Sequence, residues 1–315
     1  MRIALLDDYQ RVARDFADWH RLPAGSELAV FDQHIAERET LIATLEPFDV
    51  IVLMRERTPF PAEVVDRLPN LRLLVTTGNR NASIDLAACR ARGITVSGTG
   101  AVGTSTAELT WGLILALIKR IPLEDRALRE GRWQSGLTTG LTGKRLGLLG
   151  LGKLGTQVAR VGQAFGMEVV GWSQNLTDAL AAEAGARRVE KRELFATSDI
   201  VSLHLVLSER TEGIVGAEEL HAMKSDALFI NTARAGLVDE AALLEVLHEQ
   251  RIAGAGLDVF PIEPLPADHP LLAMPHVVLT PHLGYVTREN YTVFYRDALE
   301  DILSWMEGAP LRRLA

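Results

Sequence analysis

Cysteine is almost absent from this chain of 315 residues, which contains only Cys89. No disulfide can therefore form within the chain. Cys89 follows Leu86-Ala87-Ala88, and in that apolar setting we expect a small buried side chain rather than a catalytic thiol. Metal chemistry also has little support, because no group of cysteines and histidines has the spacing of metal ligands. We predict neither cross-links nor a metal site.

Long apolar runs and blocks of one charge are also missing. The longest apolar run, Trp111–Ile118, is far shorter than the roughly 20 residues that cross a bilayer, and Ile3–Leu6 is too short for a signal peptide. The net charge is −8, and the basic pair Arg187-Arg188 is followed by a mixture of acidic and basic residues, which is typical of a solvated surface. We expect a cytoplasmic protein that binds neither membranes nor nucleic acid.

The residues that are present favour two α/β domains. Hydrophobic residues make up 47% of the chain, which is ample for folded cores, and the length suggests about two domains. Over residues 1–100, apolar runs alternate with helical patterns, which predicts a parallel sheet covered by helices. The expected strands are Ile3–Leu6, Val50–Met54, Leu73–Thr76 and Ile94–Val96, and the expected helices include Pro61–Leu68 and Ser83–Arg92.

A long helix should bridge the two domains. Ser105-Thr106-Ala107-Glu108 has the form of a capping box, in which the serine and glutamate side chains bond backbone N–H groups at the start of a helix. We expect this helix to begin at Ser105, to run to about Arg120 and to end at Ile121-Pro122.

A second alternating series begins at Arg145 and predicts a second doubly wound parallel sheet. The helix after its first strand should place Leu154, Val158, Val161 and Phe165 on one face, and a last helix should cover about Arg288–Glu307. The expected strands are Leu146–Leu149, Glu168–Trp172, Ile200–Leu205, Leu228–Asn231, Ala255–Val259 and Val277–Leu279.

A glycine-rich turn, residues 150–155 with the sequence Gly-Leu-Gly-Lys-Leu-Gly, lies between the first strand and the first helix of this series. Gly150 allows the tight turn, Gly152 lets the backbone approach a pyrophosphate, and Gly155 lets the helix pack against the strand. The helix that begins near Lys153 and Leu154 offers N–H groups and a positive dipole end to the phosphates. We predict a dinucleotide site.

The end of the next strand leaves NAD and NADP both open. An NAD site usually has an acidic residue there, which bonds the ribose 2′-hydroxyl and repels a 2′-phosphate. This chain has Ser173 at that position, and no arginine follows at once. Serine bonds a hydroxyl or a phosphate and repels neither.

Three further segments each place one reactive side chain just after an expected strand. Arg234 lies in Asn231–Glu240, Glu263 in Leu257–Pro264 and His282 in Thr280–Gly284; these are the catalytic candidates. Ligands of open α/β sheets bind outside the carboxyl ends of the strands, so the three side chains should converge on one crevice.

These three segments and the glycine turn, in this order, resemble the D-isomer-specific 2-hydroxyacid dehydrogenase family over essentially the whole chain. The resemblance implies a Rossmann nucleotide domain, residues 101–285, inserted into a flavodoxin-like substrate domain, residues 1–100 and 286–315. It implies NAD or NADP as cofactor and a small 2-oxo or 2-hydroxy acid as substrate. Family members are commonly homodimers joined through the nucleotide domain, to which the Ser105–Arg120 helix would contribute. The chain ends soon after its last helix, so we expect no regulatory domain.

The resemblance also implies roles for the catalytic candidates. Arg234 would hold the carboxylate and carbonyl oxygens of the 2-oxo acid. His282 would give a proton to the carbonyl oxygen as the nicotinamide delivers hydride to the carbon. Glu263 would orient the imidazole and favour its charged form. Glutamate at position 263 argues against formate dehydrogenases, which have glutamine there.

Other positions would contact the cofactor or the substrate. By the same resemblance, Asp258 and the backbone near Ala233 would hold the nicotinamide carboxamide; Thr106, His204, Val206 and Gly284 complete the predicted cofactor contacts. Substrate contacts should come from two loops after strands of the first domain, through Arg55, Gly78, Asn79 and Arg80.

Tyr285 stands where the family usually has a small residue, and we hypothesise that it narrows the pocket or donates a hydrogen bond to the substrate.

Two functions are consistent with the sequence. The first is an NAD(P)-dependent enzyme that interconverts a 2-oxo acid and its D-2-hydroxy acid. The alternative is a dinucleotide-sensing binding protein similar to the co-repressors of the same fold.

Overall fold

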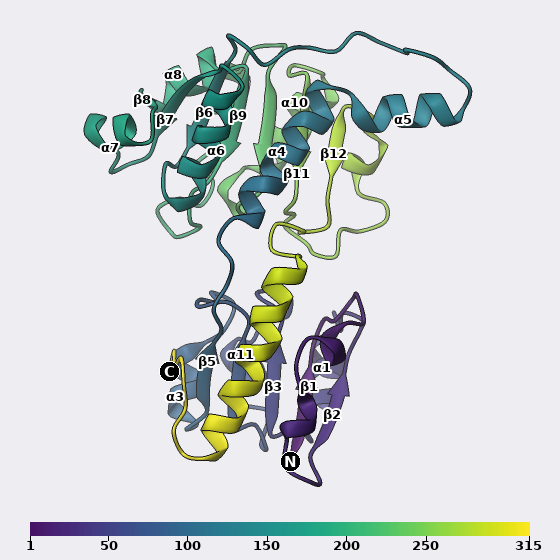
Figure 1. The fold of residues 1–315 in the computed structure, drawn as a ribbon, viewed down its shortest axis with the longest axis vertical. Helices are drawn as coiled ribbons and strands as arrows, with labels where there is room; N and C mark the ends of the chain where they lie inside the picture. The colour runs from purple at the N-terminus through teal and green to yellow at the C-terminus, as the bar shows by residue number, and fades with distance from the viewer. The chain divides into compact units, whose positions relative to one another are not determined.

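A computed structural model of the protein describes all residues from Met1 to Ala315. The chain divides into two compact units: unit 1 comprises Met1–Val102 and Thr287–Ala315, and unit 2 comprises Gly103–Val286. Each unit contains one parallel β-sheet flanked by helices (Figure 1). None of the helices combines the length and the apolar character needed to span a bilayer.

The sheet of unit 1 has the strand order β2-β1-β3-β4-β5, with all pairs parallel. The order reverses between β1 and β3, as in doubly wound flavodoxin-like sheets. Helix α11, in yellow in Figure 1, packs against β4. The strands are β1 Arg2–Leu5, β2 Glu27–Val30, β3 Val50–Leu53, β4 Leu73–Thr76 and β5 Thr95–Gly98, and the α-helices are α1 Arg38–Leu45, α2 Ala62–Val65, α3 Leu86–Ala91 and α11 Arg288–Met306. Two 3₁₀ turns, Ala13–Asp15 and Trp19–Arg21, follow β1.

The sheet of unit 2 has the order β12-β11-β10-β9-β6-β7-β8, again all parallel. The order reverses between β6 and β9, which is the Rossmann arrangement. The strands are β6 Arg145–Leu149, β7 Glu168–Trp172, β8 Arg187–Arg188, β9 Ile200–Leu203, β10 Leu228–Asn231, β11 Gly254–Leu257 and β12 Val277–Leu279. The helices are α4 Ser105–Ile118, α5 Ile121–Arg129, α6 Lys153–Ala164, α7 Asp178–Glu183, α8 Lys191–Thr197, α9 Ala217–Ala222 and α10 Glu240–His248, with 3₁₀ turns at Ala235–Leu237 and Pro270–Ala273.

Hydrophobic cores cover both faces of the unit 2 sheet, which explains why its strands are almost continuously apolar. One core contains Phe229 and Val201, and the other contains their chain neighbours Ile230 and Ile200. Helix α4 closes the second core by packing on β10, β11 and β12. A Cβ atom at Gly256 of β11 would lie 3.0 Å from Leu113 of α4, so a glycine there lets the helix approach.

The predicted two-sheet α/β fold is confirmed, but several local predictions are wrong. The N-cap residue of α4 is Thr104 instead of Ser105, and its side chain makes no capping hydrogen bond. Helix α4 ends at Ile118, and Pro122 lies in the first turn of α5 instead of ending a helix. Arg120, with φ +54°, turns the chain between the two helices.

The buried face of α6 also differs from the prediction. Val158 is buried, but Val161 and Phe165 are about 40% exposed. Gly162 faces the sheet instead, where a Cβ atom would lie 2.8 Å from Leu146. Small residues therefore bring α6 close to the strands.

Candidate active site

The three glycines of the turn differ in what surrounds them. Gly150 has φ +107°, and a Cβ atom there would lie 2.8 Å from the carbonyl group of His204. A Cβ atom at Gly155 would lie 2.0 Å from the Gly150 carbonyl oxygen. At Gly152, by contrast, a Cβ atom would meet nothing within 4 Å. The fold itself therefore requires Gly150 and Gly155, whereas Gly152 leaves open space next to the start of α6.

The start of α6 fits a dinucleotide. No side chain caps this helix end, so its first N–H groups and its positive dipole end face the space beside Gly152. Leu149 of β6 is the register partner of Leu203 of β9, which places the glycine turn at the point where the strand order reverses. That point is where doubly wound sheets bind ligands.

Neighbouring predicted contacts differ in exposure. Lys153 and Val206 are exposed, and Leu154 is half-buried. Burial lowers the pKa of His204 to about 4, so its ring is neutral at neutral pH, and its Nε2 atom lies 3.0 Å from Ser202 Oγ. Ser173 follows β7 directly and is half-buried.

Glu263 and His282 form a hydrogen-bonded pair in unit 2. His282 Nδ1 lies 2.6 Å from Glu263 Oε2, and the other carboxylate oxygen accepts a hydrogen bond from the Phe260 N–H (2.9 Å). Burial would raise the pKa of Glu263, but the hydrogen bond and charge of His282, the Phe260 N–H and the charge of Arg234 together hold it below its usual value. No protein group bonds Nε2 of His282, so a carboxylate orients the ring and its outer nitrogen is available for proton transfer.

A buried carboxylate holds the loop that carries His282. Asp258 accepts hydrogen bonds from Thr280 Oγ1 (2.6 Å) and from the N–H groups of Leu283 (2.7 Å) and Gly284 (2.9 Å). Burial raises the pKa of Asp258, although these hydrogen bonds act to lower it. His282 has φ +53°, an unfavourable conformation for a histidine that these bonds sustain.

The start of α4 holds the same loop from its other side. The hydroxyl groups of Ser105 and Thr106 both donate to the Gly284 carbonyl oxygen, at 2.9 and 2.8 Å. The hydroxyl that the capping-box pattern assigned to the helix end is therefore used to fix the loop. One turn further on, Thr110 Oγ1 lies 2.7 Å from Thr232 Oγ1, next to the segment that carries Arg234.

Arg234 extends from a turn that Asn231 shapes at the end of β10. The Asn231 amide donates to the Arg234 carbonyl oxygen and accepts from the Ala233 N–H, both at 3.0 Å. Arg234 Nη1 donates to the Ala233 carbonyl oxygen (2.7 Å). Arg234, Glu263 and His282 thus follow β10, β11 and β12, which are neighbours in the sheet.

Tyr285 lies beside the histidine of this pair. Its ring and the His282 ring have centroids 5.3 Å apart and an interplanar angle of 70°, which is an edge-to-face contact. The Tyr285 ring therefore packs directly beside the imidazole.

The predicted substrate residues of unit 1 lie on the loops after β3 and β4. Arg55 has φ +54°, and its Nη1 atom donates to the Thr77 carbonyl oxygen (3.2 Å). Gly78 has φ +87°, and its N–H already donates to Thr99 Oγ1 (2.7 Å). The expected use of that N–H for a substrate carboxylate conflicts with this bond. Asn79 and Arg80 are exposed.

One polar cluster of unit 1 went unpredicted. Asp7 follows β1 with φ +58° and is buried. Its carboxylate accepts from Thr58 Oγ1 (2.6 Å) and contacts His34 Nδ1 (3.2 Å). The sequence does contain a signal for this cluster: Asp7 and Asp8 directly follow an apolar strand. Strand ends at the point where the strand order of a sheet reverses are common ligand sites.

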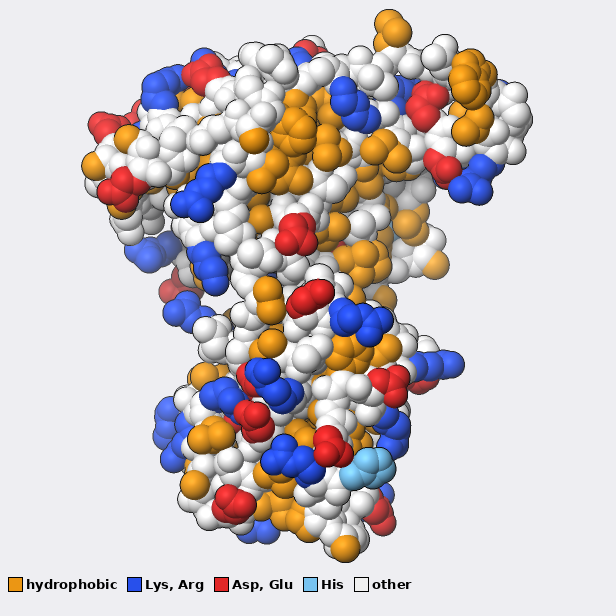
Figure 2. Space-filling model, viewed as in Figure 1, with side chains coloured by type: hydrophobic (Ala, Val, Ile, Leu, Met, Phe, Trp, Pro, Cys, Tyr) orange, Lys and Arg blue, Asp and Glu red, His pale blue; other side chains and the backbone are white.

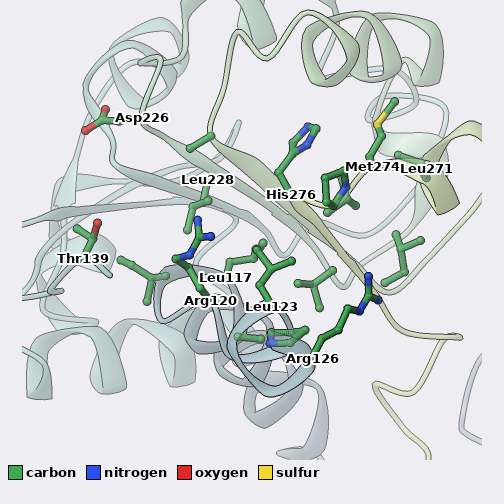
Figure 3. A pocket seen from close by; sticks show the side chains of 18 of the residues that line it. Leu117, Arg120, Leu123, Arg126, Thr139, Asp226, Leu228, Leu271, Met274 and His276 are labelled. Carbon is green, nitrogen blue, oxygen red and sulfur yellow. The ribbon is translucent and has the colours of Figure 1, made fainter. Parts of the chain in front are cut away.

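A cavity of about 480 Å³ in unit 2 lies away from these groups (Figure 3). It is lined by Lys144, Asp199 and Leu228, which stand at the amino ends of β6, β9 and β10. The candidate active site is at the carboxyl ends of the strands, so the cavity belongs to the opposite edge of the sheet.

Cys89 is fully buried as predicted, and burial raises the pKa of its thiol to about 11. No group of residues suits a metal ion.

Comparison with known proteins relates most of the chain to one family. The NAD binding domain of the D-isomer specific 2-hydroxyacid dehydrogenases matches residues 111–284. A glyoxylate reductase of Aeropyrum pernix is 36% identical over 86% of this chain and 83% of its own length. A hydroxypyruvate reductase of Blautia hydrogenotrophica is 30% identical over 99% of this chain and 98% of its own. The chain spans only about half of a matching D-3-phosphoglycerate dehydrogenase from Archaeoglobus fulgidus (36% identity, 53% of that protein and 87% of this chain).

Solved structures agree with this relationship. A phosphoglycerate oxidoreductase from Vibrio cholerae has a TM-score of 0.92 at 39% identity, covering 98% of this chain and 100% of that one. An acyclic imino acid reductase in complex with NADPH and D-Arg has a TM-score of 0.74 at 28% identity, with full coverage of both chains.

Proposed function

Because the chain belongs to the D-isomer specific 2-hydroxyacid dehydrogenase family, we propose that it interconverts a small 2-oxo acid and its D-2-hydroxy acid with NAD or NADP. The observation that carries this proposal is the 2.6 Å hydrogen bond between His282 Nδ1 and Glu263. It leaves Nε2 of an oriented imidazole available, and Arg234 follows the strand two places away in the same sheet.

The dinucleotide would supply or accept the hydride at the substrate carbon. In reduction, Nε2 of His282 gives its proton to the carbonyl oxygen, and the neutral imidazole then regains a proton from solvent. Glu263 stabilises the imidazolium before this transfer and holds the ring in place. The guanidinium of Arg234 pairs with the substrate carboxylate, for which its planar shape is suited.

The cofactor contacts follow from the same geometry. The pyrophosphate would lie against Gly152 and the first N–H groups of α6, and the ribose of the adenosine half beside Ser173. Asp258 already holds three groups of the loop that carries His282, so we assign it first to the placement of His282 and second to the carboxamide. A serine at position 173 predicts that both NADH and NADPH support turnover.

A substrate panel tests this function. Glyoxylate, hydroxypyruvate, pyruvate and larger 2-oxo acids are each reduced with NADH and with NADPH, and the hydroxy acid product is analysed for chirality. His282→Gln should lower kcat by about 10²–10⁴-fold. His269→Gln is the matched control, because His269 also pairs with a glutamate, Glu240, at 3.3 Å, and should leave activity unchanged.

Absence of turnover across the panel, together with tight dinucleotide binding, would overturn the enzymatic proposal in favour of a dinucleotide-sensing binding protein. An L-hydroxy acid product would contradict the stereochemistry that the family implies. Tyr285→Phe and Tyr285→Ala separate the two roles suggested for Tyr285. If its hydroxyl donates to the substrate, both variants should lose activity; if its ring narrows the pocket, only Tyr285→Ala should change the kinetics.

We also propose that unit 2 forms the interface of a homodimer. Helix α5 and the following loop extend from the body of unit 2 (Figure 1) and expose Leu128, Trp133 and Leu137. Figure 2 shows separate hydrophobic side chains on this extension, among polar and charged ones. The cavity in Figure 3 is lined by apolar residues such as Leu123 and Met274. A two-fold pair needs such mutually complementary surfaces on one chain.

A further inference from the structure

The segment that leaves β5, residues 99–102, is fixed by side chains within unit 1. The Gly100 N–H donates to Asp297 Oδ2 (2.9 Å), and the Val102 N–H donates to Asn290 Oδ1 (2.7 Å). Both acceptors belong to α11, which the chain forms only after it has passed through unit 2. The carboxylate of Asp297 is buried, with 6% exposure.

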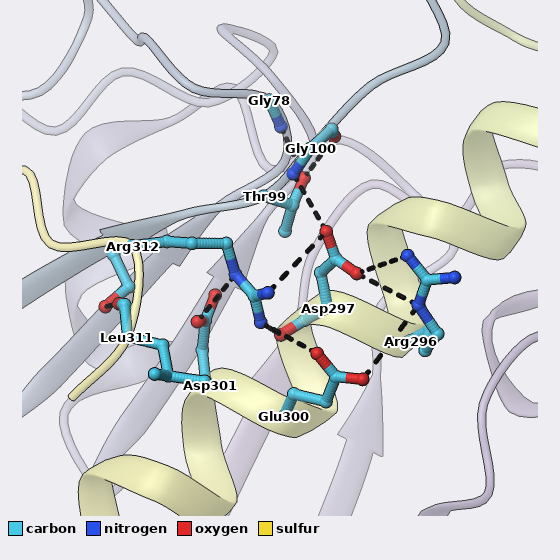
Figure 4. A network of polar contacts seen from close by, with 10 residues as sticks. Gly78, Thr99, Gly100, Arg296, Asp297, Glu300, Asp301, Leu311 and Arg312 are labelled. Atoms are coloured by element: carbon cyan, nitrogen blue, oxygen red, sulfur yellow. Dashed lines mark hydrogen bonds and ion pairs between the residues drawn. The ribbon is translucent and has the colours of Figure 1, made fainter. Parts of the chain in front are cut away.

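The same segment holds the loop after β4. Thr99 Oγ1 accepts a hydrogen bond from the Gly78 N–H (2.7 Å) and donates to the Gly100 carbonyl oxygen (2.9 Å). The Thr99 N–H in turn donates to the Gly78 carbonyl oxygen (3.0 Å). A continuous set of hydrogen bonds therefore joins Asp297, through Gly100 and Thr99, to Gly78 (Figure 4).

Asp297 is itself held by two arginines. Arg296 bonds its Oδ1 atom at 2.8 and 3.0 Å, and Arg312 donates to its carbonyl oxygen at 2.8 Å. Arg312 belongs to the C-terminal segment 311–315, and it also donates hydrogen bonds to the carboxylates of Asp301 (3.0 Å) and Glu300 (3.2 Å) on α11. That segment pairs with β5 through the Gly98 N–H and Ser97 Oγ, so it adjoins the strand from which the 99–102 segment continues.

We propose that Asp297 is a positioning residue for the substrate loop 78–80, acting through Gly100 and Thr99, and that Arg312 holds Asp297 in place. This rests on the proposed function and on the predicted contact between that loop and the 2-oxo acid. The Gly78 N–H is committed to Thr99, so the set of bonds determines where the rest of the loop, Asn79 and Arg80, presents its groups. The carboxylate far along the chain would thereby influence substrate affinity without touching the substrate.

The kinetic test uses Asp297→Asn, Arg312→Met and Thr99→Val, with Thr99→Ser as the conservative variant. We expect KM for the 2-oxo acid to rise by roughly three- to tenfold, the effect of one lost hydrogen bond, while kcat and the dissociation constant of the dinucleotide stay unchanged. Thr99→Ser should restore the native KM. Glu300→Gln is the control, because Glu300 contacts Arg312 but no backbone group of the 99–102 segment.

Amide hydrogen exchange gives a readout that does not depend on activity. Residues 76–80 should exchange faster in Asp297→Asn and Arg312→Met than in the native protein and in Glu300→Gln, at temperatures well below unfolding. Unchanged exchange in this segment would overturn the proposal even if the enzyme is active. Faster exchange in a protein without turnover would support the positioning of the loop and contradict only the proposed function. Equal changes in KM and kcat, or weaker dinucleotide binding, would also overturn it.

Discussion

The backbone at His282 shows how single residues fix the candidate active site. A histidine with φ +53° is unfavourable by itself, yet Asp258 bonds the backbone on one side of it and Glu263 bonds the ring. The ring is therefore constrained through both the main chain and the side chain. For proton transfer, such constraint keeps Nε2 at one position.

Replacing Glu263 tests the charge in this arrangement. Glu263→Gln keeps a hydrogen-bond acceptor but removes the charge that stabilises the imidazolium. We expect reduction to slow by about 10–100-fold at neutral pH, and its pH profile to move toward lower pH, because less imidazolium remains at a given pH. Steady-state rates between pH 5 and 9 measure both. Glu240→Gln, in the Glu240–His269 pair, should change neither; an unshifted profile in Glu263→Gln would contradict this role.

The sequence indicated which reactive residues follow the strands, but it did not indicate the long-range hydrogen-bond partners of the site residues. The positions of Arg234, Glu263 and His282 follow from the strands that precede them. The bond between Ser105 and Gly284 joins residues far apart in the chain, so a local pattern assigned that hydroxyl to a helix cap. The assignment of Gly78 as a carboxylate donor likewise overlooked Thr99, which directly follows another strand, β5.

At the scale of elements, the glycine turn and α6 contain positions that the fold requires and one position, Gly152, that we propose for ligand binding. The contrast between Gly155, which lies against a backbone oxygen, and Gly152, which faces open space, can be measured directly.

Gly155→Ala should lower the free energy of unfolding by about 1–3 kcal/mol, because its Cβ atom would overlap the Gly150 carbonyl oxygen. Gly152→Ala should change it by less than about 1 kcal/mol and yet weaken dinucleotide binding by at least about tenfold. Chemical denaturation and the fluorescence of bound NADH or NADPH supply the two measurements. Equal effects of both substitutions on unfolding and binding would refute this division.

The alternation of apolar runs predicted the long strands because both faces of each sheet are buried. It missed β2 and β8, whose residues are largely exposed or half-buried. The buried face of α6 was misjudged for a related reason: Gly155 and Gly162 are buried there by close approach, and a pattern of large apolar residues does not detect a face made of small ones.

At the scale of the whole molecule, insertion of one unit into the other could not be read from periodicity. Two alternating series predict two sheets, but the return of α11 to unit 1 came from the family resemblance. Long-range pairs such as Gly100 with Asp297, 197 residues apart, carry this topology.

The homodimer proposal predicts a change of mass. The native protein should sediment at twice the mass of the chain. The double variant Trp133→Ser, Leu137→Ser should sediment as a monomer with a similar circular dichroism spectrum. Leu180→Ser is the matched control, because Leu180 is an exposed apolar residue on α7, outside both the cavity and the loop that follows α5. A native monomer, or a double variant that stays dimeric, would contradict the interface.

Asp301 should make stability depend on pH. Burial, with the charges of Asp297 and Glu300, raises its pKa to about 7 despite Arg312, whereas an unfolded aspartate titrates near 3.9. Between about pH 4 and 7 the native state therefore retains a proton that the unfolded state has lost, and this contribution to stability falls as pH rises through 7.

Asp301→Asn cannot lose that proton. Relative to the native protein, its free energy of unfolding should therefore rise by roughly 2–4 kcal/mol between pH 4 and 8. Urea denaturation at a series of pH values measures the difference. A difference that stays constant over this range would show that Asp301 does not titrate as described.

The pairing of residues 311–315 with β5 also bears on synthesis of the chain. Ser97 finds its partner Leu311 after 214 further residues, whereas all residues of unit 2 are contiguous. On the ribosome, unit 2 can complete its sheet while α11 is still untranslated, and domains generally fold as units during synthesis. Unit 1, although it begins first, is finished after unit 2, and its β5 edge remains unpaired until residues 311–315 emerge.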